Sequence, residues 1–326
     1  MKHIVKDIST TSLALFEPKK THPFITENIE DILIFDIETT GLHHQHCEVI
    51  LIGYFYVKNG CYYIEQIFAE TPNEEKELLE KFKIVSSKFN YLLSYNGNSF
   101  DIPFLNSRYQ KHHLDYLLDK SLNIDLLRVA RLLSKTLKLE NYKLKTVEQF
   151  LGIYRKDEIS GKESVELYNR YIFSPNAHLK EVILLHNFED ILYLAKVADL
   201  LYYQKHDDWC NLPILFLYDK RRYYIRDFKV SKDFLKLKIF SRDLKRKRIH
   251  FSSGQLSLEQ SEQLITLKVP VFKITIDDSV LNFIDIDLIS EGKINFNSLS
   301  YNKKLAYLVS PLSLPTAMKT LFNIIG

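Results

Sequence analysis

The spacing of apolar residues predicts strands in the first part of the chain and helices after them. Runs rich in β-branched and aromatic residues predict the strands, and the polar tripeptide at 58–60 is typical of a hairpin turn. The predicted strands lie at 31–37, 48–57, 61–68 and 91–95, and helical patterns lie at 73–87 and over much of 124–203. This order of elements predicts an α/β domain of about 200 residues.

The pattern changes after residue 206, where short apolar segments alternate with polar turns. These segments lie at 214–218, 223–227, 235–240, 264–269, 271–276 and 281–286. They predict a smaller β-rich module. Because residues 1–30 carry little periodicity, we predict a leader segment at 1–30, an α/β domain at 31–205 and a β-rich C-terminal domain at 206–326.

Two carboxylates in the first predicted strand carry the strongest chemical signal. Asp36 and Glu38 are two residues apart, so their side chains emerge on the same face of the strand. A strand that is apolar on both faces is normally buried, and there adjacent unpaired carboxylates cost free energy and repel each other. We therefore expect a positive group beside them. Mg²⁺ or Mn²⁺ is the simplest candidate, since both ions prefer oxygen ligands.

Composition favours a soluble protein of two domains. The 326 residues are 46% hydrophobic and 26% charged, which is ordinary for a folded protein. No apolar run is long enough to cross a bilayer, and the first residues lack the continuous apolar core of a signal peptide. A cytoplasmic location without membrane association is therefore expected. The three cysteines are widely spaced and odd in number, which supports neither a disulfide framework nor a zinc site.

The net charge of +3 is unevenly distributed along the chain. Residues 206–326 hold 19 basic and 13 acidic residues, and 219–248 alone hold 13 basic and 4 acidic residues. Aromatic residues are interleaved with this basic segment. Such a combination can attract phosphates and stack on unpaired bases, but the aromatic residues can equally face the core of a sheet whose charged face is solvated.

Two more acids occur where they can join the first pair. Asp101 follows a polar turn at the start of a predicted helix, where an acid can equally compensate the helix dipole. Asp190 lies in a helix with apolar residues on nearly all its faces, and His186 lies one turn earlier on the same face. A polar stripe of His186, Asn187 and Asp190, hydrogen-bonded inside the core, is the alternative explanation for that helix.

Three separated segments of the chain resemble the motifs of the DEDD superfamily of 3′→5′ exonucleases, which have a ribonuclease-H-like fold. Residues 36–42, DIETTGL, resemble the motif D-x-E-T-T-G-L, and residues 96–105 resemble N-x-x-x-F-D-x-P-F-L. The sequence HNFED at 186–190 supplies the last aspartate. Within this superfamily the chain is most similar to the YprB-type bacterial ribonuclease-H-like family, in which H-N-x-x-D follows a segment resembling residues 144–168.

The resemblance implies a ribonuclease-H-like mixed sheet flanked by helices and a metal-dependent 3′→5′ exonuclease. The expected substrate is DNA, single-stranded or frayed at its ends, with RNA as a second possibility, and two Mg²⁺ or Mn²⁺ ions are the expected cofactors. The implied metal ligands are Asp36, Glu38, Asp101 and Asp190. His186 is expected to act as the general base or to orient the site. The implied substrate-binding residues are Thr39, Thr40, Leu42, Asn96 and Phe104.

Several residues keep a second explanation. The Thr-Thr-Gly sequence at 39–41 can equally form a turn, and Leu42 and Phe104 can equally belong to the core. Asp125 precedes a predicted helix, and a helix cap is its favoured role. A histidine-rich stretch looks like a metal cluster but lacks the paired spacing of a zinc site, so we interpret it as a loop. It contains His43, His44, His46 and Cys47.

Two rival functions share the same fold. One is a catalytically silent nucleic-acid-binding module, and the other is a structure-specific endonuclease. The four acids are all present, which counts against the first rival. A substrate with a blocked 3′ end separates an exonuclease from an endonuclease, because only the endonuclease continues to cut it.

Overall fold

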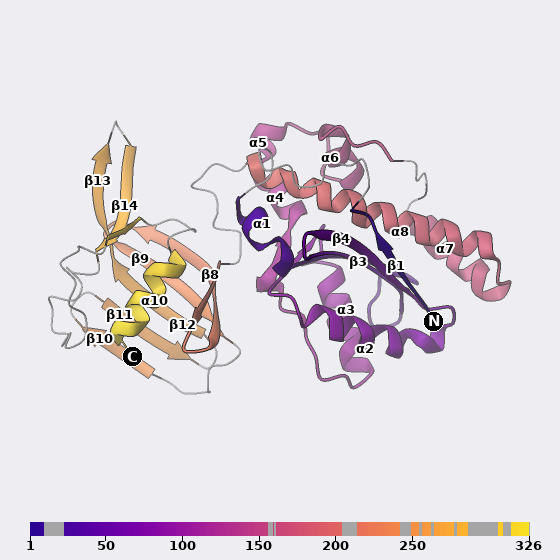
Figure 1. The fold of residues 1–326 in the computed structure, drawn as a ribbon, viewed down its shortest axis with the longest axis horizontal. Coiled ribbons are helices and arrows are strands. Elements are labelled where there is room, and N and C mark those ends of the chain that lie inside the picture. Colours follow the sequence, from indigo (N-terminus) through magenta and orange to yellow (C-terminus); the bar gives the residue numbers. More distant parts are fainter. Residues whose placement is uncertain are drawn as a thin grey trace. The chain divides into compact units, whose positions relative to one another are not determined.

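The computed structural model defines two compact units, Met1–Gln204 and Lys205–Gly326, which we describe separately (Figure 1). The structure describes residues 1–9, 23–155, 159, 161–203, 214–241, 249–253, 256–261, 264–276, 279–285, 306–308 and 314–325. Within these ranges, the helices are too short or too polar to span a bilayer.

A mixed six-stranded sheet forms the centre of the first unit, with the order β1-β4-β3-β2-β5-β6. Its strands are β1 (Lys2–Asp7), β2 (Ile32–Thr39), β3 (Val49–Lys58), β4 (Cys61–Phe68), β5 (Tyr91–Ser94) and β6 (Asn123–Asp125). The first four are antiparallel neighbours, and β5 and β6 run parallel to β2. The predicted mixed α/β fold is therefore confirmed. The sequence pattern did not predict β1, whose side chains are mostly exposed and lack apolar alternation.

Helices cover both faces of this sheet (Figure 1). They are α1 (Pro23–Asn28), α2 (Glu75–Ser86), α3 (Asp101–Lys111), α4 (Leu126–Leu132), α5 (Ser134–Leu137), α6 (Leu144–Phe150), α7 (Gly161–Phe173) and α8 (Ala177–Val197). Short 3₁₀ helices lie at Ile29–Asp31, Pro72–Glu74, Lys120–Leu122 and Ala198–Tyr203. One hydrophobic core joins the sheet to α2 and α3, and a second joins it to α7 and α8.

The alternation of side chains along β2 separates its core residues from its acids. Leu33, Phe35 and Ile37 belong to the core shared with α2 and α3. Asp36 and Glu38 have the opposite parity, so they face the side of the sheet that α8 covers. The predicted common face of the two carboxylates thus lies under the helix that carries the third motif.

A buried ion pair joins α2 to α3 and to the start of β3. The Glu75 carboxylate accepts hydrogen bonds from Arg108 Nε at 2.7 Å and from the Val49 amide at 2.8 Å. His112 Nε2 lies 2.6 Å from the same carboxylate. Arg108 is 1% exposed, and removing one partner from such a buried pair typically costs about 3–5 kcal/mol. This network fixes α3, whose first residue is Asp101.

The second unit is built mainly from antiparallel strands. A six-stranded sheet has the order β10-β11-β12-β9-β8-β7, and a three-stranded sheet has the order β13-β14-β15. The strands are β7 (Ile214–Tyr218), β8 (Arg221–Ser231), β9 (Phe234–Phe240), β10 (Ile249–Ser253), β11 (Leu256–Ser261), β12 (Leu264–Pro270), β13 (Phe272–Ile276), β14 (Ser279–Asp285) and β15 (Ala306–Leu308). One further helix, α10 (Leu314–Ile325), joins their hydrophobic core.

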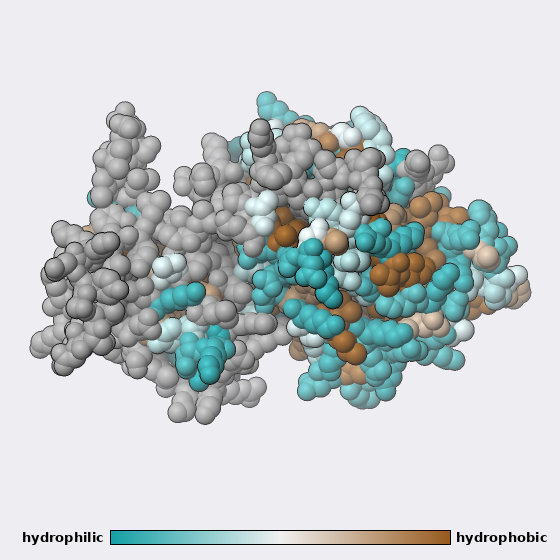
Figure 2. All heavy atoms as spheres, viewed as in Figure 1, coloured by the Kyte–Doolittle hydropathy of each residue, from teal (hydrophilic) through white to brown (hydrophobic). Residues whose placement is uncertain are grey.

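The β-rich character predicted for the second unit is confirmed. Tyr223, Tyr224 and Phe240 of the basic segment are buried. Burial of these three aromatic side chains fits the alternative in which the aromatic residues pack inside, and they are not exposed for stacking on bases. Lys220 and Arg221 are exposed. The basic run at 245–248 lies outside the described residues. On the face of the first unit visible in Figure 2, hydrophilic side chains predominate and smaller hydrophobic patches lie between them.

Candidate active site

One pocket of the first unit, about 780 Å³ in volume, gathers most of the predicted catalytic residues. Asp36 and Glu38 reach it from β2, and His186 and Asp190 reach it from α8. The pocket therefore forms where the end of the central strand meets the helix that covers it. Its position matches the expectation that a site forms at the end of a sheet strand.

Glu38, His186 and Asp190 form a compact group of metal-ligand type. His186 Nε2 lies 3.5 Å from Glu38 Oε1 and 3.5 Å from Asp190 Oδ2. One ligand atom from each residue lies within 4.8 Å of the other two. Within the part of the chain that the structure describes, no second group of three such residues comes this close together.

Asp36 is placed beside this group with one of its oxygens already held. Asn187 Nδ2 donates a hydrogen bond of 3.2 Å to Asp36 Oδ2. Burial raises the pKa of Asp36 well above its usual range, and the negative charges of Asp190, Asp101 and Glu38 raise this pKa further. Because these charges act on Asp36 together, the acids from the three motifs belong to one electrostatic cluster.

Asp101 is fixed at the first turn of α3 against the end of β2. Its Oδ1 accepts a hydrogen bond of 3.3 Å from the Ile37 amide, and its side chain is buried. Burial raises the pKa of Asp101 to about 7, and the nearby charge of Asp125 adds to this effect. The Asp125 carboxylate accepts hydrogen bonds from the amides of Asn96 and Asn98, and so holds the turn that precedes α3.

The electrostatics of the cluster fit a cation. Burial raises the pKa of Glu38 to about 7, and the charge of Asp190 raises it as well, although the neighbouring His186 opposes the shift. The pKa values of Asp36, Glu38 and Asp101 are all raised, so burial disfavours their charged forms. A positive group beside these acids would stabilise the charged forms. Carboxylate oxygens are the ligands that hard divalent cations such as Mg²⁺ and Mn²⁺ prefer, so the acids of the cluster fit the implied ions.

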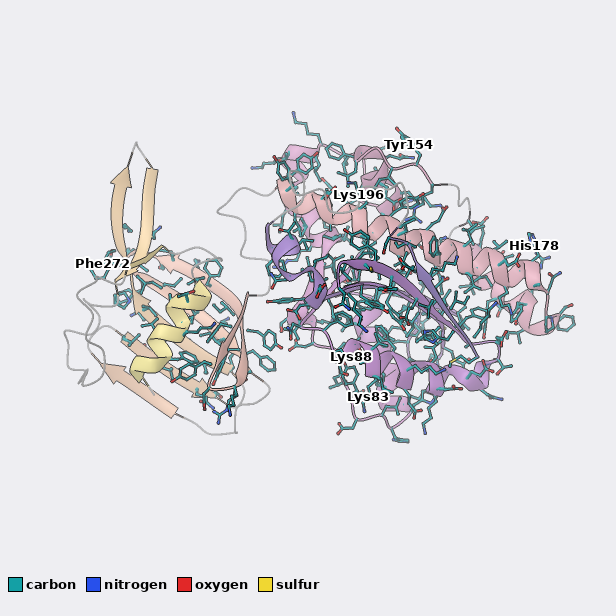
Figure 3. All side chains as sticks on the ribbon, viewed as in Figure 1. Lys83, Lys88, Tyr154, His178, Lys196 and Phe272 are labelled. Carbon is teal, nitrogen blue, oxygen red and sulfur yellow. The ribbon has the colours of Figure 1, made fainter. Side chains whose placement is uncertain are left out.

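Arg155 is a component of the site that the sequence did not predict. Its guanidinium donates hydrogen bonds to Asp190 Oδ1 and, through two nitrogens, to Glu148. Its side chain is 5% exposed, whereas the neighbouring Tyr154 is 77% exposed at the outer surface of the segment after α6 (Figure 3). Arg155 lies within the 144–168 segment that resembles the YprB-type family, but no spacing rule connects it to Asp190.

The predicted substrate-binding residues separate into two groups. Leu42 and Thr39 line the pocket, and Leu42 is 79% exposed there. Thr40, Asn96 and Phe104 are not among the described residues that line it. Phe104 lies on α3, is 1% exposed and belongs to the hydrophobic core between α3 and the sheet.

Both threonines of the motif also make turn contacts. Thr39 Oγ1 donates to the Gly41 carbonyl at 2.8 Å, and Thr40 Oγ1 accepts from the Glu48 amide at 2.9 Å. These bonds order the chain directly after the acids of β2. The side-chain hydroxyls therefore serve the turn in this structure.

Two other polar groups have the structural roles that the sequence favoured. Asp125 caps α4, since its Oδ1 accepts a hydrogen bond from the Leu127 amide at 3.1 Å. The histidine-rich stretch lies between β2 and β3, where the His44 ring packs against Phe104 at 6.3 Å between ring centroids. No metal-ligand group within the described residues includes a member of this stretch.

Basic residues also line the pocket. Lys143 and Lys145 line it from the start of α6, and Lys162 lines it from α7. Lys145 Nζ donates to the Ile159 carbonyl at 3.0 Å, which ties two of the lining residues together. With Leu42 in the same lining, the pocket has cations that can attract phosphates and an apolar side chain that can contact a base.

Together, the mixed sheet with helices on both faces and the acids at the end of its central strand define a ribonuclease-H-like protein. The family model of the RNase_H superfamily matches residues 33–202, more than half of the chain, so the chain belongs to this superfamily. Membership supports a nucleic-acid-cleaving function, and enzymes of this class generally use divalent metals. The matched range contains every residue of the acid cluster.

Comparisons with individual proteins add little beyond the family. No curated protein sequence matches the chain. Similar solved structures include the family B DNA polymerase from the hyperthermophilic archaeon Pyrobaculum calidifontis, with 16% identity over 63% of this chain and a TM-score of 0.40. They also include a nuclease in its apo form, with 17% identity, a TM-score of 0.34, and coverage of 55% of this chain and 75% of that one. The chain spans 33% of the polymerase, about a third of its length.

Proposed function

We propose that this protein is a metal-dependent 3′→5′ exonuclease of the DEDD type, close to the YprB-type family, with DNA as its first substrate and RNA as its second. The observation that carries this proposal is that three acids from two distant segments line one pocket, while a fourth, Asp101, is bonded to the backbone of the strand that carries two of them. Asp36 and Glu38 come from β2, Asp101 from α3 and Asp190 from α8. A purely structural polar stripe on α8 would not need acids from the other two elements.

The four acids provide enough ligands for two ions. Glu38, His186 and Asp190 lie close enough together to hold one ion, and Asp36 lines the same pocket. Asp101 accepts a hydrogen bond from the Ile37 amide, and its charge helps to raise the pKa of Asp36. Divalent ions held by these residues would activate a water and neutralise charge on the scissile phosphate. In this proposal Asp36 serves both ions, and the support is that the charges of the other three acids all raise its pKa.

His186 is placed to handle a proton. Its Nε2 faces the site between Glu38 and Asp190, 3.5 Å from an oxygen of each. An imidazole titrates near neutral pH, so His186 can take the proton of the attacking water at Nε2 as general base. The same two contacts allow His186 to orient the carboxylates, which is its alternative role.

The pocket walls favour a single strand end. Lys143, Lys145 and Lys162 are the cations available to the phosphates upstream of the scissile bond. Leu42 projects into solvent at the pocket and can pack on an unpaired terminal base. A paired base presents its face to its neighbours in the stack, so a frayed or single-stranded end fits this side chain better.

We also propose that catalysis resides in residues 31–205 and that residues 206–326 add affinity for nucleic acid. The support is the excess of 19 basic over 13 acidic residues in the second region. Exposed Lys220 and Arg221 supply part of this charge on the described surface.

The decisive experiment replaces Asp36 by Asn. Asp36→Asn keeps the shape of the side chain but removes a charge from the centre of the cluster. We expect Mg²⁺- or Mn²⁺-dependent release of mononucleotides from 5′-labelled single-stranded DNA and RNA to fall on the order of 10²–10³-fold or more. Asp115→Asn, at an exposed residue outside the pocket, is the matched control and should retain full activity.

The same assay decides between the rivals. If the wild-type chain cleaves neither DNA nor RNA with either metal, the protein is a catalytically silent binding module. If it continues to cut a substrate whose 3′ end is blocked, it is an endonuclease. An active Asp36→Asn variant would show that the acid cluster is not the catalytic site.

A further inference from the structure

A buried amide, Asn187, connects the acid cluster to the backbone of α8. Asn187 has no exposed surface, and its Nδ2 donates to Asp36 Oδ2 at 3.2 Å. Its Oδ1 accepts a hydrogen bond of 3.0 Å from Gln66 Nε2 on β4. Gln66 Nε2 also donates to the Leu184 carbonyl at 2.8 Å. The three groups form a continuous chain of hydrogen bonds that ends on the carboxylate of Asp36.

The backbone carbonyl at the other end fixes the direction of this chain. A carbonyl only accepts, so the Gln66 group that faces Leu184 must be its NH₂. That NH₂ then donates to Asn187, which turns the oxygen of Asn187 toward Gln66 and its own NH₂ toward Asp36. The donor that faces Asp36 is therefore dictated by the protein and does not depend on which way either amide is drawn.

A missing side chain on β3 makes room for this arrangement. Gly53 is the residue paired with Asp36 across the sheet. A Cβ at Gly53 would lie 2.0 Å from Asn187 Oδ1 and 2.8 Å from its Cγ, distances that no Cβ can occupy. Because the Asn187 side chain is fully buried and hydrogen-bonded at both ends of its amide, a larger residue at position 53 displaces it from these bonds.

We propose that Asn187 is a positioning residue that fixes the carboxylate of Asp36 for metal binding. Asn187 holds Oδ2 of Asp36, so that Oδ1 is left to bind a metal ion. Gln66 fixes which end of the Asn187 amide faces Asp36, and Gly53 provides the space for that amide. This inference rests on the proposed function, since it assigns a role at the same metal site. Groups that orient a metal ligand typically affect metal affinity or activity by about 10–100-fold.

The test compares two perturbations of Asn187 with a structural control. Asn187→Ala removes the donor, and Gly53→Ala keeps every polar group but pushes Asn187 out of place. Asn106→Ala is the matched control, because Asn106 also uses both ends of its amide, bonding the Leu118 carbonyl and amide outside the pocket. Each full-length variant is freed of metal and titrated with Mn²⁺ by calorimetry, and its KM, kcat and melting temperature are measured.

We expect Asn187→Ala and Gly53→Ala to weaken Mn²⁺ binding by about 10–100-fold and to lower kcat with little change in KM. Asn106→Ala should melt at a lower temperature and bind Mn²⁺ within about twofold of wild type. If both site variants lose thermal stability but keep wild-type Mn²⁺ affinity and kcat, Asn187 is only structural and the inference is overturned.

The two proposals fail in distinguishable ways. If the wild-type chain binds Mn²⁺ but cleaves no nucleic acid, the proposed function fails, and the affinities of the variants still decide the role of Asn187. If the wild-type chain binds no Mn²⁺, the inference about Asn187 is overturned together with the metal site.

Discussion

Arg155 offers the most demanding test of how the charges in the site are balanced. Its guanidinium bonds Glu148, which is 1% exposed, and Asp190, which is 15% exposed. Arg155→Met removes the cation and leaves Glu148 as a buried carboxylate without its partner. Breaking a buried pair in this way costs about 3–5 kcal/mol of the free energy of unfolding. Asp190 contributes less to the loss, because it is more accessible to water.

The double variant Glu148→Leu with Arg155→Met separates pairing from packing. With both charges gone, no carboxylate is left buried alone, so we expect most of the lost stability to return. For a domain of this size, 1 kcal/mol shifts the melting temperature by roughly 2–4 °C, which predicts a loss of about 6–20 °C for the single variant. The melting temperature is measured on the metal-free chain by far-UV circular dichroism at a helical wavelength. This signal reports on the first unit, because α1 to α8 belong to it.

The pH dependence of this loss follows from Glu148. Burial raises the pKa of Glu148 even with Arg155 in place, and Arg155 opposes that rise. Without the arginine, the folded-state pKa rises further, so protonation relieves the cost at low pH. Arg155→Met should therefore lower the melting temperature less at pH 5 than at pH 8. If the single variant melts within about 2 °C of wild type at both pH values, or no lower than the double variant, the buried-pair reasoning is refuted.

Two more predictions concern the acids and the pocket wall. Burial raises the pKa values of Glu38 and Asp101 from 4.5 and 3.8 to about 7, so the folded metal-free chain holds protons that the unfolded chain has lost. The stability of the metal-free chain should therefore fall as pH rises from about 4 to 7, and Mn²⁺ should raise the melting temperature most at pH 8. Melting curves recorded with chelator and with Mn²⁺ at several pH values test both expectations. A melting temperature that does not change with pH in the presence of chelator would contradict the raised pKa values of these two acids. Leu42→Ala should raise KM several-fold without lowering the melting temperature, because Leu42 is 79% exposed, and an unchanged KM would remove Leu42 from the substrate contacts.

The parts of the site that the sequence predicted follow from local rules. Asp36 and Glu38 lie on the same face of β2 because side chains alternate along a strand. His186 and Asp190 lie on the same face of α8 because they are four residues apart in a helix. Several strands of the second unit were predictable for the same reason, since β9 alternates buried and exposed residues. Strands β10, β11 and β15 were not predicted, although β11 also has a buried residue at every second position.

The parts that the sequence missed depend on tertiary packing. Arg155 meets Asp190 only because the segment after α6 folds back onto α8, and Gln66 meets Asn187 only through the pairing of β4 in the sheet. No spacing rule relates residues so far apart in the chain. Helix α10 was missed for a different reason, because its sequence does carry a helical pattern that we did not assign. Its buried apolar residues follow the spacing i, i+3, i+4, i+7, i+8, and they are Leu314, Ala317, Met318, Leu321 and Phe322.

The span of the acid cluster has a consequence for how the protein is made. The hydrogen bond between Asp36 and Asn187 joins residues 151 positions apart, and His186 and Asp190 lie on the same late helix. A nascent chain that has reached only α3 carries Asp36, Glu38 and Asp101 but still lacks His186, Asn187 and Asp190. The acid cluster therefore cannot assemble until α8 has left the ribosome, so the proposed metal site would be incomplete in an unfinished chain.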